Sequence, residues 1–413
     1  MQIVHVSDTH LGAKPYHINR LQEHVIEAFD TVIDYVIEAR PRVMIIAGDV
    51  IDRPRPETQI LLHLVRKLKE VTERGVKVIL AHGEHDTPGR KDKTLLEVLS
   101  EAIDGVYAPR ITGSTLEERV AKSMIQIDYT TIGVYQFVKT HVERQREYAK
   151  NIMPLYEKAF SRVDGRKVFV AHIGVEGTLI EYATHVNPRD LPSVDYAALG
   201  HHHGRWYWKR DGSQGPLMAV YPGSLYPLTI REARSNDKRG PILVDLSGDE
   251  PVIQEEYNVE VAKHIVTREI TIPTPEYIKV EQRLREVVAN STRGINKEVV
   301  LHVPVSIGIT VSRAKIESIF IKLSRQMNKI IIPHIRLTAT PGESRAVEDV
   351  IVASVDPIEI IKTTYKVSEE TAKLILALKD ALASGDVEAA DSIIDELTQK
   401  GELLKLANAK GLR

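Results

Sequence analysis

The chain has 413 residues, 43% hydrophobic and 27% charged, a composition typical of globular proteins and unlike that of disordered or fibrous chains. Lys and Arg number 55 against 57 Asp and Glu, so any nucleic-acid site must be a local patch rather than a general positive charge. Cysteine is absent, which excludes disulfides and thiolate metal sites. We find no signal peptide and no apolar run of the roughly 18–20 residues that a membrane helix needs, so we expect a soluble, cytoplasmic protein with no membrane contact.

Residues 1–255 are predicted to form one domain in which strands alternate with helices. Strands are expected at 3–6, 43–47, 76–81, 123–128, 133–135, 168–171 and 196–200, and helices at 21–39 and 57–73. This alternation indicates a layered α/β or α+β fold. Polar residues and glycines follow these strands, at the edge where such sheets place their sites.

Two further regions follow. Residues 262–343 are predicted to form a small α+β domain, with strands at 265–272, 299–303 and 330–337 and helices at 275–289 and 312–327. Residues 350–413 are predicted to be helical, with Ser368 as the N-cap of one helix and Gly385 at its end. Two such helices cannot bury their own apolar faces, so they dock either on this chain or on a partner.

Five segments at predicted strand ends carry metal-ligand side chains. They contain Asp8 and His10; Asp49 and Asp52; Glu84 and His85; His172; and His201 and His203. Taken alone, such a residue is more often a structural histidine or a turn residue, but five such segments occur in order along the chain. Residues two apart on a strand or at its end point the same way and can reach one ion. Carboxylate and imidazole ligands without sulfur suit Mn²⁺, Fe or Zn²⁺. A carboxylate shared by two ions would make a hydrolytic centre for phosphoryl transfer.

The segments resemble the running pattern D-x-H, G-D, G-N-H-[DE], H, G-H-x-H of the calcineurin-like metallophosphoesterase superfamily. Residues 7–12, 47–52, 198–203 and 221–225 more specifically resemble the SbcD or meiotic-recombination-eleven type of DNA repair nuclease. Residues 356–359 are similar to the segment that follows that family's capping domain. The resemblance implies a β-sandwich flanked by helices at 1–255, a DNA-capping domain at 262–343 and an ATPase-binding helical region at 350–413.

The resemblance also implies the site. One metal would be held by Asp8, His10, Asp49 and His203, and the other by Asp49, Glu84, His172 and His201. Asp49 would bridge two Mn²⁺ ions, His85 would stabilise the transition state or donate a proton, Asp52 would orient His85, and Asp86 would order the loop. The family has Asn where this chain has Glu84, which either ligates the metal as a carboxylate or weakens or crowds the centre.

The implied function is a manganese-dependent DNA exonuclease and endonuclease, a hydrolase of the phosphodiester class. It would act as a homodimer at DNA ends, near the nucleoid, with a coiled-coil ATPase in double-strand-break repair. His17, Arg20, Arg53 and Arg55 would contact DNA phosphates or are solvated loop cations.

Two alternatives remain open at this point. In the first, Glu84 has degraded the centre and the protein is a DNA-end-binding scaffold with weak catalysis. In the second, the protein is another metallophosphoesterase, because residues 48–53 are similar to the G-D-x-x-D-R-G motif of protein phosphatases, with Pro54 in place of the last glycine. The apolar face of the helix at 57–73 belongs either to the core or to a dimer interface.

Overall fold

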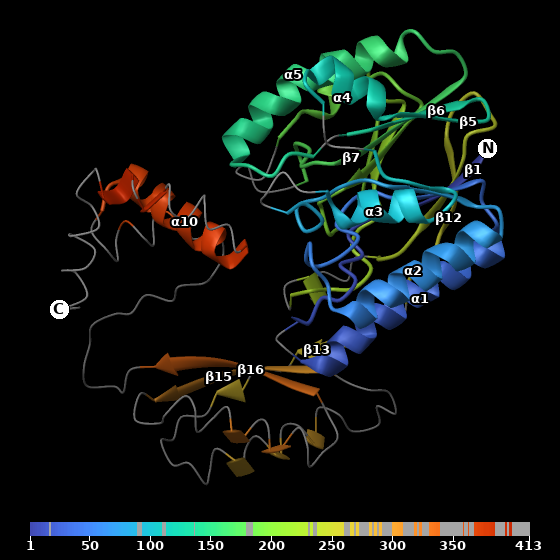
Figure 1. The fold of residues 1–413 in the computed structure, drawn as a ribbon. Helices are drawn as coiled ribbons and strands as arrows, with labels where there is room; N and C mark the ends of the chain where they lie inside the picture. Colours follow the sequence, from blue (N-terminus) through green and yellow to red (C-terminus); the bar gives the residue numbers. More distant parts are fainter. Residues whose placement is uncertain are drawn as a thin grey trace. The chain divides into compact units, whose positions relative to one another are not determined.

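The fold is seen in a computed structural model of residues 1–413 (Figure 1). The structure describes residues 1–259 except 16–17, 89–92, 110–112, 136, 179–184, 230–231 and 234–237. Beyond residue 259 it describes 265–267, 270–271, 300–308, 330–338, 367–384 and several shorter stretches. The chain divides into two compact units, Met1–Thr87 with Lys93–Thr340 and Pro88–Asp92 with Pro341–Arg413.

The first sheet has the strand order β12-β11-β1-β2-β3-β4. Its strands are β1 (Gln2–Val6), β2 (Val43–Ile46), β3 (Lys77–Leu80), β4 (Val106–Tyr107), β11 (Ile242–Asp245) and β12 (Val252–Glu256). The four strands β1 to β4 are parallel, and β11 and β12 add antiparallel pairs beside β1. The carboxyl ends of β1, β2 and β3 therefore meet at one edge.

The second sheet has the strand order β5-β6-β7-β8-β10-β9. Its strands are β5 (Met124–Ile127), β6 (Thr130–Val134), β7 (Arg166–His172), β8 (Tyr196–Gly200), β9 (Trp206–Lys209) and β10 (Met218–Tyr221). Strands β6, β7, β8 and β10 are parallel, whereas β5 and β9 pair antiparallel at the two sides. This sheet likewise gathers the carboxyl ends of its central strands.

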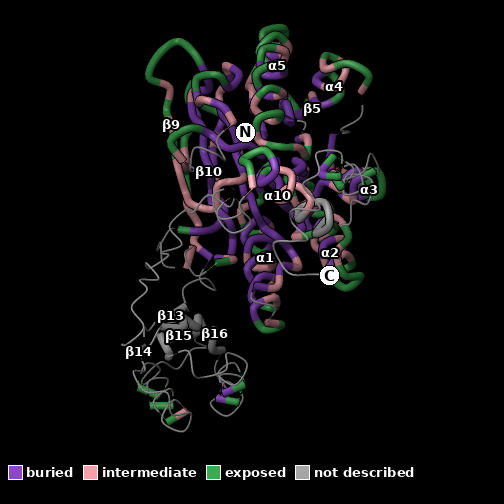
Figure 2. The backbone as a smooth tube through the Cα atoms, turned by 90° about the vertical axis from the view of Figure 1, so that its left-hand side faces the viewer, coloured by how far each residue is buried: buried purple, intermediate pink, exposed green. Residues whose placement is uncertain are grey.

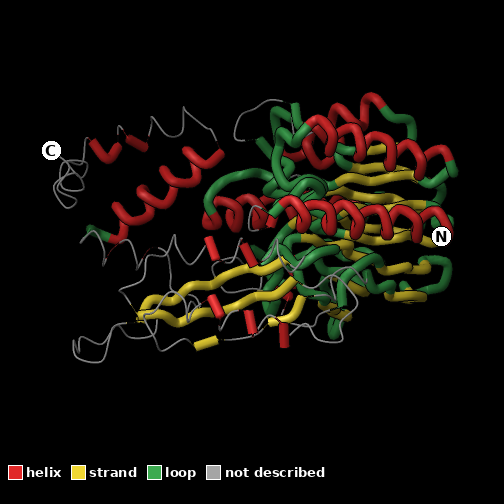
Figure 3. The backbone as a smooth tube through the Cα atoms, turned by 90° about the horizontal axis from the view of Figure 1, so that it is seen from below, coloured by secondary structure: helices red, strands yellow, loops and turns green. Residues whose placement is uncertain are grey.

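The two sheets pack face to face and helices cover their outer faces. Ile3, Ile45 and Ile79 point inward and meet Val170 and Ala198 of the second sheet, because alternate residues of a strand face opposite sides. Their neighbours face the helices instead. Figure 1 shows α1 and α2 on one side of the strands and α5 on the other, and in Figure 2 the strands between them are buried. The layers are thus helix, sheet, sheet and helix (Figure 3).

Apolar residues at helical spacing form the covering helices. These are α1 (Asn19–Ala39), α2 (Thr58–Glu73), α3 (Leu95–Ala102), α4 (Leu116–Lys122) and α5 (Val142–Phe160), with a 3₁₀ turn at Pro188–Asp190. In α2 the residues Ile60, Leu64 and Leu68 are buried in the core, as expected for a face with a period of 3.6. The helix α3 begins with a capping box in which Thr94 and Glu97 bond each other's backbone N–H groups.

A separate sheet lies between residues 265 and 338. It consists of β13 (Ile265–Thr267), β14 (Ile270–Thr271), β15 (Val300–Gly308) and β16 (Ile330–Thr338), all in parallel pairs. Parallel neighbours require a crossover connection, and helical turns are described at 318–319 and 322–323, between β15 and β16. The helix α10 (Glu369–Ser384) begins after Ser368, whose hydroxyl accepts the Thr371 N–H at 3.1 Å, as predicted for an N-cap.

The predicted fold class is confirmed, including the β-sandwich flanked by helices. The helix α5 and the strands β10 to β12 were not predicted, and β15 extends to Gly308 rather than ending at residue 303. Most of the helices predicted at 275–289 and 312–327, together with Gly385, lie outside the described residues. Among the described residues, no helix is long and apolar enough to span a membrane.

Candidate metal centre

The predicted metal ligands follow strands whose carboxyl ends converge. Asp8 and His10 follow β1, Asp49 follows β2, His172 ends β7 and His201 follows β8. Backbone hydrogen bonds tie the first two loops together, from Asp8 N–H to Gly48 O (3.1 Å) and from His10 N–H to Asp49 O (2.9 Å). The edge shared by the two sheets is therefore where these side chains meet.

Turns rather than strand alternation aim these side chains. Asp8, His10, Asp49 and His201 all have positive φ, at 50°, 41°, 49° and 102°, a conformation that costs a residue with a side chain free energy. Asp8 with His10, and His201 with His203, were predicted to point the same way because of strand alternation. That reason was wrong, because β1 ends at Val6 and β8 at Gly200. The side chains of Asp8, His10 and His203 still converge.

Two glycines make the convergence sterically possible. A Cβ at Gly48, whose φ is +86°, would lie 2.3 Å from His172 Nδ1. A Cβ at Gly83 would lie 2.2 Å from Asp49 Oδ1. No side chain fits in either place, so these positions need glycine for space as well as for conformation.

Three clusters of possible ligands share members. They are Asp8 with His10 and His203; Asp8 with Asp49 and His172; and His10 with Asp52 and His85. The Asp49 carboxylate lies between two histidines, with its Oδ2 3.3 Å from His172 Nε2 and 3.6 Å from His10 Nε2. His10 Nε2 in turn lies 3.2 Å from His203 Nε2. Asp49 thus belongs to the cluster of His172 and also lies near His10 of the other two, as a bridging carboxylate would.

Hydrogen bonds fix which ring nitrogen faces the centre. His172 Nδ1 lies 3.0 Å from the carbonyl oxygen of Ala47, and because a carbonyl oxygen only accepts, Nδ1 carries the proton. With Nδ1 committed to this bond, Nε2 is the ring nitrogen that faces the Asp49 carboxylate. His172 Nε2 and Asp49 Oδ2 lie 3.3 Å apart. A carboxylate oxygen and a ring nitrogen without a proton would repel each other when buried at this distance, so a proton or a cation must lie between them.

The charges at the centre agree with this geometry. Burial raises the pKa of Asp49, but the attraction of His172 and His10 outweighs it and holds that pKa well below the ordinary value. Burial lowers the pKa of His10 to about 3 and that of His201 well below the ordinary value. Burial also lowers the pKa of His172, yet Asp49 raises it to about 10. Without a metal, the His172 ring therefore carries a proton on both nitrogens and pairs with the ionised Asp49 carboxylate. A metal ion bound at His172 would displace the proton from Nε2, so metal binding would release a proton.

Buried polar atoms without partners support a metal at this place. Among the described residues, His172 Nε2 and His10 Nδ1 are buried and make no hydrogen bond. Such orphaned nitrogens are rare in folded proteins. Mixed imidazole and carboxylate donors suit Mn²⁺, Fe or Zn²⁺, so the residues present fit a divalent metal. The expectation of divalent metal binding is confirmed at this level.

Two predicted ligands stand apart from these clusters. Glu84 is exposed, and its carboxylate belongs to none of the three clusters found among the described residues. His201 also belongs to none, although its ring lies 5.2 Å from the His172 ring between centroids. Its backbone N–H donates to both carboxylate oxygens of Asp8 at 3.1 Å, which orients Asp8 instead.

His85 lies at the mouth of the centre. Its ring packs edge-on against His10, with 4.7 Å between centroids, and its side chain is 42% exposed. Its Nδ1 donates to the main-chain carbonyl oxygen of Asp52 at 2.8 Å, whereas the Asp52 carboxylate is 4.0 Å away. The orienting group predicted as the Asp52 side chain is therefore the Asp52 main chain.

Asp86 orders its loop, as predicted, and joins the loop that follows β3 to the loop that follows β2. Its fully buried carboxylate accepts the N–H groups of Val50 (3.2 Å), Ile51 (3.1 Å) and Gly83 (3.0 Å). Burial and the nearby Asp49 raise its pKa to about 7 despite these three bonds.

Three of the four residues predicted to contact DNA, all arginines, lie on the surface. Arg53 is 72% exposed, with Nε 3.5 Å from Asp52 Oδ2 beside the centre. Arg55 is also exposed, and Arg20 pairs with Glu23 on α1. His17 lies outside the described residues.

Glu232 and His185 were not predicted, although both lie beside the predicted ligands. Glu232 Oε2 lies 3.2 Å from His203 Nδ1. Burial raises the pKa of Glu232, but the bond to His203 outweighs burial and lowers that pKa to about 2. The pattern Thr229-x-x-Glu232, a helix-capping signature, marked its position. His185 accepts the Gly174 N–H at Nδ1 (2.8 Å), and its ring lies 5.6 Å from that of His201.

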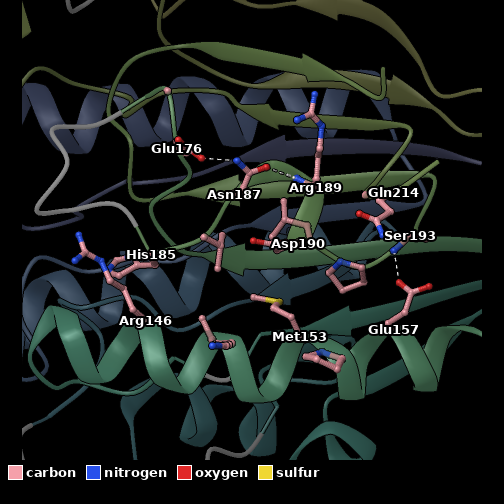
Figure 4. Close-up of a pocket in the computed structure, with 18 residues that line it drawn as sticks. Arg146, Met153, Glu157, Glu176, His185, Asn187, Arg189, Asp190, Ser193 and Gln214 are labelled. Atoms are coloured by element: carbon pink, nitrogen blue, oxygen red, sulfur yellow. Dashed lines mark hydrogen bonds between the residues drawn. The ribbon is translucent and has the colours of Figure 1, made fainter. Parts of the chain in front are cut away.

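His185 also lines a pocket with a cavity volume of about 1130 Å³. Figure 4 shows Arg146 beside His185 at one end, and Glu157 accepting the Ser193 N–H at the other. The helix α5 forms one wall, and residues 176–177, 185–187, 189–193 and 214–215 form the rest. None of the predicted metal ligands lines this pocket, so it borders the candidate centre without containing it.

Comparison with known proteins decides the family. The profile of the calcineurin-like phosphoesterase family matches residues 1–211. The chain belongs to the calcineurin-like phosphoesterases. A phosphoesterase of this family is a metal-dependent hydrolase, as the motifs predicted.

Archaeal relatives of this phosphoesterase extend the match. It is 28% identical to the DNA double-strand break repair protein Mre11 of Aeropyrum pernix, over 96% of either chain. It is 26% identical to the protein of the same name from Sulfolobus acidocaldarius, over 73% of this chain and 74% of that one. The resemblance of this phosphoesterase to the SbcD and meiotic-recombination-eleven type is confirmed.

Proposed function

We propose that this phosphoesterase is a manganese-dependent DNA nuclease, acting as exonuclease and endonuclease in double-strand-break repair. The observation that carries the proposal is the Asp49 carboxylate between His172 and His10, with clusters of ligands on both sides. That arrangement suits two ions roughly 3.5–4 Å apart, the spacing of metal pairs in phosphodiester hydrolysis. The names of the archaeal relatives support DNA as the substrate.

The chain's own residues divide the work. Asp8, His10, Asp49, His172, His201 and His203 would hold two Mn²⁺ ions, and Glu84 is proposed as a further ligand once its side chain turns inward. Bound metals would supply a hydroxide near neutral pH and neutralise the charge of the phosphodiester. His85 is held by its Nδ1–H bond to Asp52 O, and its Nε2–H would donate to the scissile phosphate or to the leaving oxygen. Arg20, Arg53, Arg55 and His17 are proposed to contact neighbouring phosphates.

The assembly is proposed from the resemblance to the DNA repair nucleases. The chain would form a homodimer and bind a coiled-coil ATPase through residues 350–413, while residues 262–343 cap the DNA. Leu62 on α2 and Val98 on α3 are 46% and 47% exposed, which supports helical contacts between protomers. Light scattering of wild type beside Leu62→Lys and Val98→Lys tests this: the variants are expected to be monomeric, and unchanged dimers would contradict these contacts.

The test of the nuclease is digestion of end-labelled duplex and single-stranded DNA with Mn²⁺, Mg²⁺ or EDTA. We expect cleavage by wild type with Mn²⁺ and at least a 100-fold loss in His85→Ala, because general acid–base groups contribute about 10²–10⁴-fold. His141→Ala, at an exposed histidine on the α5 cap, is the matched control and should cleave as wild type does. Cleavage that persists in EDTA would contradict a metal-dependent nuclease.

One observation favours a second function. The exposed Glu84 carboxylate lies outside the ligand clusters, which would leave one metal with fewer ligands and favours a DNA-end-binding scaffold with weak catalysis. Glu84→Asn restores the residue type expected from the resemblance. If the variant cleaves at least ten times faster than wild type while both bind DNA equally, the scaffold is favoured. Equal rates favour the nuclease, and phosphatase activity without DNA binding would contradict both.

A further inference from the structure

Glu232 stands directly behind one of the proposed metal ligands. Its Oε2 lies 3.2 Å from His203 Nδ1, on the far side of the ring from Nε2. Nε2 of the same ring lies 3.2 Å from His10 Nε2 and 3.8 Å from Asp8 Oδ1, inside the ligand cluster. The imidazole therefore spans the distance between the proposed metal and the Glu232 carboxylate.

Further hydrogen bonds hold Glu232 in place. Its Oε2 also accepts the Leu228 N–H at 3.0 Å, and its Oε1 accepts the Thr229 hydroxyl at 2.9 Å. In return its own N–H donates to Thr229 Oγ1 at 3.2 Å. A carboxylate fixed at both oxygens can hold an imidazole ring in one orientation.

A second site on the chain shows what this arrangement does without a histidine. At the start of α4, Glu118 Oε2 accepts the Ser114 N–H at 2.9 Å and the Glu118 N–H donates to Thr115 Oγ1 at 3.2 Å. Glu118 uses its other oxygen to pair with Lys122 on the surface. Both glutamates thus cap a turn, but only Glu232 of these two contacts a residue of the candidate centre.

Arg239 joins the backbones of the same residues. Its buried guanidinium donates to His203 O at 3.1 Å through Nη1 and to Glu232 O at 3.1 Å through Nη2. The main chains of the histidine and the glutamate are therefore fixed relative to each other. Such support is what a rigid ligand set needs, because a side chain that rotates binds a metal more weakly.

We propose that Glu232 is a positioning residue of the metal centre. Its carboxylate accepts the Nδ1 proton of His203, which keeps the Nε2 lone pair directed at the site shared with Asp8 and His10. Residues that orient a ligating histidine in this way typically contribute 10–100-fold to metal affinity. The inference rests on the metal centre of the proposed function, and it adds a residue that the motif pattern does not contain.

The test measures Mn²⁺ affinity directly, from the electron paramagnetic resonance signal of free Mn²⁺ during titration of the full-length protein. We expect Glu232→Ala to weaken the Mn²⁺ site that includes His203 30–100-fold, since the ring loses its acceptor. Glu232→Gln keeps a neutral acceptor of the same shape and is expected to lose about 10-fold. Glu118→Gln, the matched capping glutamate, is expected to bind Mn²⁺ as wild type does.

The outcomes separate this inference from the proposed function. If His203→Ala loses the site while Glu232→Ala and Glu232→Gln bind as wild type does, Glu232 is only a helix cap and the inference fails. If His203→Ala also binds as wild type does, the metal centre itself is wrong. Thermal unfolding of each variant shows whether it is folded, and the near-isosteric Glu232→Gln keeps the test decisive if Glu232→Ala does not fold.

Discussion

His85 is oriented by the main chain of Asp52: its Nδ1 donates to the Asp52 carbonyl oxygen at 2.8 Å, while the Asp52 carboxylate lies 4.0 Å away. A main-chain carbonyl oxygen accepts a hydrogen bond at every pH, and a substitution of the Asp52 side chain leaves this oxygen in place. The main chain of the loop that follows β2 therefore keeps a proton on His85 Nδ1 and fixes the orientation of the ring.

Substitution of the Asp52 side chain should consequently be mild. We expect Asp52→Asn to lower the rate of DNA cleavage less than about 10-fold, against the 10²-fold or greater loss of His85→Ala. Single-turnover cleavage at saturating Mn²⁺ measures both rates. A loss in Asp52→Asn as large as that in His85→Ala would mean that the carboxylate, and not the carbonyl, sets the function of His85.

Two glycines with the same backbone conformation should respond very differently to alanine. Gly48 and Gly75 have φ values of +86° and +84°, so both pay about 1 kcal/mol for a Cβ in the left-handed region. Only at Gly48 would the new atom meet His172, at 2.3 Å, whereas at Gly75 nothing lies within 4 Å. In urea unfolding, Gly48→Ala should cost about 3 kcal/mol or more and abolish Mn²⁺ binding. Gly75→Ala should cost about 1 kcal/mol and bind Mn²⁺ normally, and similar losses in both would contradict the steric argument.

The buried His5 should make the fold sensitive to acid. Burial lowers its pKa from 6.5 to about 3, and its Nδ1 lies 2.9 Å from the Tyr196 hydroxyl. Between pH 6.5 and pH 3 the unfolded chain binds a proton at this residue and the folded chain does not, so stability falls as the pH falls. From these two pKa values, His5 removes about 2 kcal/mol between pH 8 and pH 5.

The measurement is urea unfolding at pH 8 and pH 5. His5→Gln should lose less stability over this interval than wild type, by about 2 kcal/mol. His141→Gln, at an exposed histidine, should follow the wild-type curve. The same pH dependence in His5→Gln and wild type would show that His5 is not responsible.

Removal of the Asp86 carboxylate should loosen two loops at once. Asp86→Ala leaves the N–H groups of Val50, Ile51 and Gly83 without their acceptor, at about 1–3 kcal/mol for each buried group. We expect a loss of at least 3 kcal/mol in urea unfolding at pH 8. Asp211→Ala, which removes an exposed partner of Arg189, should change stability by less than about 0.5 kcal/mol. A small effect of Asp86→Ala would contradict its role as the link between the loops.

Much of the fold could be read from the sequence because buried parallel strands have a strong signal. The strand predicted at 196–200 matches β8, and the helix predicted at 57–73 begins one residue later, at Thr58. The helix α5 was missed because Pro154 lies inside it and argues against a helix, although Ala149, Ile152 and Tyr156 keep a helical spacing. Tertiary packing against the second sheet compensates for the hydrogen bond that proline removes.

The candidate site was predictable only in part, because only some of its residues belong to a local sequence pattern. Strand ends with Asp and His are local features, so Asp8, Asp49 and His172 could be brought together from the sequence. Glu232 could not, because it lies 29 residues beyond His203 and its capping signature carries no sign of a histidine partner. The exposure of Glu84 was equally invisible, since a side chain's direction in a turn depends on contacts across the fold.

The left-handed backbone at Asp8, His10, Asp49 and His201 lowers the stability of the fold, while the side chains at these four positions are candidate metal ligands. A glycine at any of them would relieve the backbone while removing a candidate ligand. Selection for thermal stability alone would therefore favour substitutions at these residues that also inactivate the protein. In a laboratory evolution experiment, only a simultaneous demand for metal-dependent activity would keep the strained residues, and their persistence would itself report that the centre is in use.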